Sequence, residues 1–322
     1  MNESQLRIIF VFTDLVLPLL TGYYLHQRKI ISDRLCNRLI SFNIIWICTL
    51  LSLLSFWVLP LTAELLWLPA FSFIFAAIPG MISILTFARQ HKEPLDRGAY
   101  IISSLLANIG TLGGLCAFIL YGETGFAYAQ LVVTFQNLIL ILGCFPLAQY
   151  YYALHTAAKA RKHLHINVKD LFLSWNQLSV LGMLVGMLLQ AAAVPRPESL
   201  GGLFNGLIHL SAWTALLPVG YLVDFHQAGQ YYRRILDLLP LRFIILPAIT
   251  YFIIKQLFTD QVLLGSLMIF ASSPTAINAV LTARIYKLNV DLTIAAFLLT
   301  TALFLLLIYP CLFFYVQLGH LW

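Results

Sequence analysis

Ala107-Asn-Ile-Gly-Thr-Leu-Gly-Gly114 interrupts one apolar segment of this chain, and Ser272-Ser-Pro-Thr-Ala-Ile-Asn278 interrupts another at the matching place in its second half. Each stretch is predicted to lie in the middle of a membrane-spanning helix. Hydrocarbon offers no water to bare backbone groups, so a helix is interrupted there only where protein or a polar cavity satisfies them. Paired interruptions therefore predict a binding site near the membrane midplane.

The composition predicts an all-α integral membrane protein. Of the 322 residues, 61% are hydrophobic and 10% are charged, whereas soluble domains carry about 25% charged residues. A spanning helix needs about 20 mostly apolar residues, and segments of that length recur along the chain. We expect ten transmembrane helices, at 8–26, 39–60, 64–88, 99–121, 126–152, 172–193, 200–225, 238–257, 261–283 and 291–316.

The basic residues predict the orientation of these helices. Of the 19 Lys and Arg residues, all but Arg7, Arg196 and Lys255 fall in the odd-numbered connections or at their helix margins. Lys and Arg gather in cytoplasmic loops, so we expect both termini outside and an uncleaved first helix in a plasma (bacterial inner) membrane. The same rule explains the net charge of +6, so we expect the lipid bilayer, and no nucleic acid, as a partner. The five cysteines show no CxxC spacing, and we expect no metal site.

Five helices on each side of one cytoplasmic linker place the second half upside down relative to the first. We expect a first repeat at 1–152, a basic linker at 153–171 and an inverted second repeat at 172–322. One shift of the sequence superposes Gly22 on Gly186, Ala107 on Ala271 and Thr111 on Thr275, and it also superposes the two interruptions. The fourth and ninth helices are therefore predicted to be antiparallel, broken and crossed.

Broken helices present charge without ionised side chains. The freed N–H groups and carbonyls form positive and negative dipole ends, and such ends can hold an anion. This matters because no Lys or Arg is expected deep in a span. Arg242 and Lys255 lie near opposite ends of the eighth helix, and both are expected to extend to the membrane interfaces.

Motifs surround both interruptions. The first half reads Asn108-Ile-Gly-Thr-Leu-Gly-Gly, then Tyr121-Gly-Glu-Thr-Gly-Phe-Ala-Tyr-Ala, then Gln136-Asn137. The second half reads Leu246-Pro, then Ser273-Pro-Thr-Ala-Ile-Asn-Ala-Val-Leu-Thr-Ala, followed by Tyr286. Over essentially the whole chain, these motifs resemble the auxin efflux carrier family, which includes bacterial permeases for malonate and malate.

The resemblance implies a fold similar to that of bile-acid symporters and sodium/proton antiporters, with ten helices in two inverted repeats. It implies a scaffold or dimerisation domain from helices 1, 2, 6 and 7, and a transport domain from helices 3–5 and 8–10 that moves relative to it. Substrate would bind where helices 4 and 9 cross. Asn108 and Asn278 match the crossover asparagines of the family, and Pro274 matches its proline in helix 9.

The chain departs from the family pattern in helix 4. Where the family has proline after glycine, this chain has Leu115 preceded by Gly113 and Gly114. Glycine weakens a helix by about 1 kcal/mol relative to alanine, but it keeps the N–H that proline lacks. A softer break is therefore expected at this glycine pair.

The candidate substrate-binding residues gather on the two interruptions and on helix 5. An alternative is that the small polar residues only join helices by packing and hydrogen bonds. Gln136 and Asn137 are adjacent on a helix, so at most one of them can face a shared cavity. The candidates are Asn108, Gly110, Thr111, Gly113, Gly114, Gln136, Asn137, Ser272, Ser273, Pro274, Thr275 and Asn278.

Three other features of the spans are notable. Asp14 is an acid inside the first helix and a candidate for proton or sodium coupling, although it lies close enough to the outer end to be hydrated. His209 in the seventh helix is expected to be a hydrogen-bonded packing residue. Gly182 and Gly186 form a GxxxG motif that permits close helix approach, either within one chain or across a homodimer.

The leading functional prediction is a secondary transporter of a small organic anion, a carboxylate, that works by alternating access at the crossover site. Its energy would come from a gradient of a proton, of sodium or of the substrate, and no cofactor is expected. The alternative is a transport-inactive membrane sensor or regulator that retains the fold. An enzyme is not expected, because the chain has no GxSxG or HExxH motif and no paired intramembrane aspartates.

Overall fold

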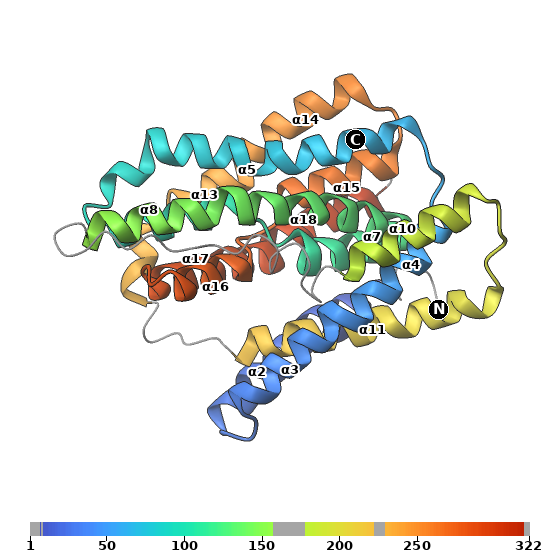
Figure 1. Cartoon of the computed structure of the whole chain (residues 1–322), viewed down its shortest axis with the longest axis horizontal. Helices are drawn as coiled ribbons and strands as arrows, with labels where there is room; N and C mark the ends of the chain where they lie inside the picture. Colours follow the sequence, from blue (N-terminus) through green and yellow to red (C-terminus); the bar gives the residue numbers. More distant parts are fainter. Residues whose placement is uncertain (1–6, 8, 157–177, 222–228, 319–322) are drawn as a thin grey trace. The chain divides into compact units, whose positions relative to one another are not determined.

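The computed structural model describes residues 7, 9–156, 178–221 and 229–318. The chain divides into two compact units, and their helices are labelled in Figure 1. Unit 1 comprises Met1–Leu66, Gly110–Gln130 and Asn167–Val223, and unit 2 comprises Trp67–Ile109, Leu131–Ile166 and Asp224–Trp322. From residue 157 onward, the predicted basic linker lies outside the described residues.

The protein is an all-α integral membrane protein. The described residues contain no β-strand beyond one isolated bridge. Six helical stretches are long and apolar enough to cross a membrane: Asp33–Val58, Ala63–Leu85, Ile109–Thr156, Glu198–Tyr221, Leu238–Leu257 and Val290–Gln317. Two apolar helices are shorter, Leu178–Ala191 and Gln261–Ala271.

Unit 1 contains α2 (Leu17–Gln27), α3 (Asp33–Phe42), α4 (Cys48–Val58), α10 (Leu178–Ala191) and α11 (Glu198–Tyr221). Wide helical turns at Val11–Val16 and Asn43–Ile47 precede α2 and α4. In this unit α10 packs along α4 and α11 along α2. The buried amide of Asn43 joins helices by donating to the hydroxyls of Ser211 and Thr214, each over 2.9 Å.

Glycines allow the two pairs of helices in unit 1 to approach closely. A side chain at Gly182 or Gly186 of α10 would collide with the carbonyls of Thr49 or Leu53 on α4. Membrane helices associate through such small residues because lipid gives them no hydrophobic drive to pack. The GxxxG motif therefore packs two helices of one chain against each other, which is the first of the two possibilities raised by the sequence.

Unit 2 contains α5 (Leu68–Leu85), α6 (Pro94–Leu105), α8 (Phe145–Thr156), α13 (Leu238–Pro240), α14 (Leu246–Leu257), α15 (Gln261–Ala271), α16 (Ile277–Ile285), α17 (Val290–Leu303) and α18 (Tyr309–Gln317). In it, α6 packs against α5, α8 and α17, while α16 packs against α17. Polar side chains begin two of these helices: Asp260 accepts a hydrogen bond from the Val262 N–H, and Asn289 from the Leu292 N–H, each over 3.0 Å.

The chain passes from one unit to the other along α7 (Gly114–Ile139). This helix departs from helical geometry at Gly122, whose φ of 65° lies in the left-handed region that favours glycine. Gly122 falls in the connection predicted between the spans 99–121 and 126–152. The long stretch Ile109–Thr156 is therefore bent where the sequence predicted a turn.

Candidate binding site at two helix interruptions

Both interruptions exist, but the first lies earlier than predicted. Helix α6 ends at Leu105, residues 106–108 are non-helical, and a wide helical turn resumes over Ile109–Gly113. Gly113 and Gly114 are thus helical, and the expectation of a soft break at this pair is wrong. Two glycines cost a helix too little to break it when its hydrogen bonds can form. The second interruption lies between α15 and α16, at residues 272–276.

The two interruptions meet within unit 2 and satisfy each other's backbone. Ala107 and Thr275 form an antiparallel bridge. The Asn108 N–H donates to the Pro274 carbonyl over 2.7 Å, and the Ala276 N–H donates to the Leu106 carbonyl over 2.9 Å. Backbone groups freed by the two breaks are therefore paired with protein, as they would have to be in hydrocarbon.

Side chains complete the pairing at this crossing, by which we mean residues 106–108 and 272–276. Thr275 donates through Oγ1 to the Ser103 carbonyl over 3.1 Å, and its N–H donates to Thr300 Oγ1 over 3.0 Å. Gln136 Nε2 donates to the Ala107 carbonyl over 2.8 Å. Of the adjacent pair on α7, Gln136 is thus the one that reaches the crossing.

Arg242 lies in an environment that differs from the one predicted from the sequence. Its side chain is 0% exposed and does not extend to an interface. Its Nη2 donates to the carbonyls of Ser103, Ser104 and Leu106 at 3.0, 2.8 and 2.7 Å. Arginine suits this position because its guanidinium offers several donors in one plane. The available signal was an ionisable residue inside a predicted span, which by default indicates function.

The predicted site residues divide between the two units. In unit 2, the crossing brings together Asn108, Gln136, Pro274 and Thr275, all buried. Ser272 and Ser273 are also buried and bond to the end of α15, while Asn137 and Asn278 are half-buried. The remaining candidates, Gly110, Thr111, Gly113 and Gly114, belong to unit 1.

Asp14 has a partner that the sequence did not indicate. In unit 1 its Oδ2 lies 2.6 Å from Nδ1 of His209, and Thr13 Oγ1 donates to its Oδ1 over 3.3 Å. Asp14 is 6% exposed, so it is buried in the protein. The coupling candidate and the expected packing histidine therefore form one pair, while coupling itself stays a prediction.

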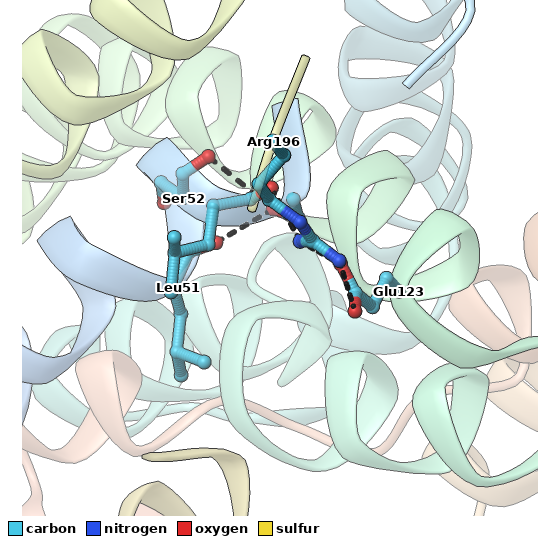
Figure 2. Close-up of polar contacts among 6 residues, drawn as sticks. Leu51, Ser52, Glu123 and Arg196 are labelled. Atoms are coloured by element: carbon cyan, nitrogen blue, oxygen red, sulfur yellow. Dashed lines mark hydrogen bonds and ion pairs between the residues drawn. The ribbon is translucent and has the colours of Figure 1, made fainter. Parts of the chain in front are cut away.

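A half-buried ion pair also lies in unit 1. Arg196, between α10 and α11, binds both carboxylate oxygens of Glu123 over 2.6 and 3.0 Å, and its Nη1 also donates to the Leu54 carbonyl over 3.0 Å. Figure 2 shows the two side chains beside Leu51 and Ser52 of α4. The pair joins the residue after the Gly122 bend to the end of α4.

Removing one partner of this pair should destabilise the protein. We expect Arg196→Gln to lower the free energy of unfolding by about 2 kcal/mol, because the Glu123 carboxylate would be left without its charge partner. The double variant Arg196→Gln, Glu123→Gln should be more stable than the sum of the single effects implies. Denaturation in detergent gives the free energy of unfolding of the wild type, Arg196→Gln, Glu123→Gln and the double variant. Additive losses would contradict the pair.

A scan against models of known protein families and a search of curated proteins found no match to this chain.

Proposed function

We propose that this protein is a secondary transporter that moves a small organic anion, a carboxylate, by alternating access at the crossing. The observation that carries the proposal is the bridge between two interrupted helices within unit 2. Discontinuous helices that meet near the midplane are where secondary transporters bind their substrates. Helix α16 begins without a side-chain cap, so its positive end is suited to a negatively charged group.

The proposed architecture is ten helices in two inverted repeats, with both termini outside a plasma (bacterial inner) membrane. Support comes from two helix contacts in unit 1. Gly22 of α2 packs on the carbonyl of Leu217, and Gly186 of α10 packs on that of Leu53. The shift that superposes Gly22 on Gly186 also superposes Leu53 on Leu217, so the two contacts exchange partners. An inverted repeat would produce this reciprocity.

We also propose that unit 1 is the scaffold and unit 2 the domain that moves, as in the auxin efflux carrier family that the motifs resemble. Unit 1 holds α2–α4, α10 and α11, and unit 2 holds α5, α6, α8 and α13–α18. Residues 110–130, which comprise the end of the fourth predicted helix and the start of the fifth, belong to unit 1, whereas the resemblance implies the transport domain for them. A homodimer would use scaffold surfaces other than Gly182 and Gly186.

The sensor alternative has two grounds, a softened break in helix 4 and the lack of a clear coupling carboxylate. The first is not supported, because Leu106 is extended, with φ −98° and ψ 119°, as Ala276 is in helix 9. Both interruptions are therefore complete. The second ground remains, and the absence of transport in the experiment below would favour a sensor.

Uptake into proteoliposomes tests the proposal. Radiolabelled dicarboxylates and aromatic acids should enter in a saturable manner, and Asn108→Ala and Asn278→Ala should each reduce that uptake by about tenfold or more, the size expected for loss of a polar contact to a charged solute. The control is Asn205→Ala, at an exposed position of α11, which should transport normally. Saturable uptake that survives both crossover substitutions would place the site elsewhere.

A further inference from the structure

Arg242 is a buried cation that no described carboxylate neutralises. Its side chain is fully shielded, and among the residues that the structure describes, no Asp or Glu forms an ion pair with it. A buried charge is costly unless it is paired and hydrogen-bonded. Another source of negative potential must therefore hold this guanidinium in place.

That source is the C-terminal end of α6. The last carbonyls of a helix have no partners within it and carry partial negative charge. Nη2 of Arg242 lies within 3.0 Å of three such oxygens, on Ser103, Ser104 and Leu106. In transporters with discontinuous helices, unwound carbonyls and half-helix C-termini coordinate the coupling cation. Here a guanidinium fills a cage of that kind.

The other two nitrogens of the Arg242 guanidinium, Nε and Nη1, make no hydrogen bond to the described residues. Both are buried, although buried donors in native proteins are nearly always paired. Nη2 shares the Leu106 carbonyl with the Ala276 N–H at the start of α16. A fixed cation and the positive end of a helix thus meet at one oxygen, and both favour an anion there.

We propose that Arg242 is the built-in cation of the crossing: Nη2 fills the carbonyl cage, and Nε and Nη1 donate to the carboxylate of the transported solute. The identity of the solute rests on the proposed function, whereas the cage does not. Charge-assisted hydrogen bonds are the strong ones, so Arg242 selects a carboxylate over an amide of the same shape. Removing the side chain should leave a cage that a small cation can enter.

The wild-type protein provides the first test, by thermal unfolding in detergent. A panel of carboxylates is compared with the matching amides, in sodium chloride and in choline chloride at equal ionic strength. Carboxylates should raise the unfolding temperature in both salts, and the amides should leave it unchanged. Equal shifts from the amides, or a shift from carboxylates that needs sodium, would overturn the proposal.

Substitution of Arg242 tests the cage directly. In choline chloride, Arg242→Ala should bind carboxylates about tenfold more weakly or worse, as expected for loss of a charged hydrogen bond. Sodium ion or a low concentration of guanidinium ion should raise the unfolding temperature of Arg242→Ala and leave that of the wild type unchanged. The control is Lys255→Ala, an exposed position in the last turn of α14, which should behave as the wild type.

The outcomes separate the two proposals. If no carboxylate stabilises the wild type, the transport proposal fails, and the response of Arg242→Ala to cations still decides the cage. If Arg242→Ala binds carboxylates as the wild type does, or if neither sodium nor guanidinium changes its unfolding temperature, the inference about Arg242 fails while the transport proposal stands. If Arg242→Ala does not fold, Arg242→Lys replaces it. The single ammonium of lysine should fill the carbonyl cage, so that added guanidinium ion has no effect on the unfolding temperature. Carboxylate binding should be weakened, because one nitrogen cannot fill the cage and also bind the carboxylate.

Discussion

Gly220→Ala is expected to lower the free energy of unfolding by about 3 kcal/mol, the upper part of the usual range for overpacking a tight contact. Gly220 lies on α11, where it faces the backbone of Leu19 on α2. An added Cβ would press on the Leu19 carbonyl oxygen and lie 2.9 Å from its Cα. Because the obstacle is backbone, relief requires the two helices to move apart, and Gly22 makes a similarly close contact on the same pair.

The same helix provides the control for this substitution. A Cβ at Gly206 of α11 would meet nothing within 4 Å. Alanine is favoured over glycine inside a helix by about 1 kcal/mol, so Gly206→Ala should leave stability unchanged or raise it slightly. Denaturation in detergent compares both variants with the wild type. If Gly220→Ala unfolds like Gly206→Ala, then α2 and α11 do not pack as described.

The positions of the helices could be predicted from the sequence because they depend on local composition. The helical stretch Leu238–Leu257 has the predicted bounds, and α15 begins at the predicted residue, Gln261. Asp260 precedes that helix with a suitable capping side chain, which is a local signal. Hydropathy and capping need no knowledge of neighbouring helices, so both can be read from one chain.

The two interruptions show where local reasoning ends. The break after α15 contains Pro274, which lacks an N–H and could be recognised directly. The break after α6 contains neither proline nor glycine, only Leu106, Ala107 and Asn108. It is held open by groups far away in sequence, namely Pro274 and Gln136 among others. The sequence therefore indicated the correct region, but the glycine pair was the wrong cause.

Two buried charges were misplaced for the same reason. Arg242 and Asp14 lie near the ends of predicted spans, where water or an interface would be available to an isolated helix. In the structure, other helices cover them. Three carbonyls of the α6 end surround Arg242, and His209 contacts Asp14. Depth in a predicted span measures distance from the helix end, and it carries no information about these partners.

A cysteine at position 277 is expected to react with thiol reagents, whereas a cysteine at a fully buried position should not react at all. Ile277 is half-buried and begins α16, next to Ala276 at the crossing. Thiol reagents attack the thiolate, which forms only where water can solvate it. In a chain whose five native cysteines are replaced, Ile277→Cys should therefore react when the crossing is open to an aqueous phase. Ile269→Cys, fully buried in α15, should stay unreactive and is the control.

The most direct test of alternating access applies one membrane-impermeant maleimide to Ile277→Cys in right-side-out and in inside-out vesicles. The account predicts modification from either side of the membrane, with both reactions slowed by a carboxylate that the protein transports. Modification from one side only, or from neither side, under every condition would contradict alternating access at the crossing of residues 106–108 and 272–276.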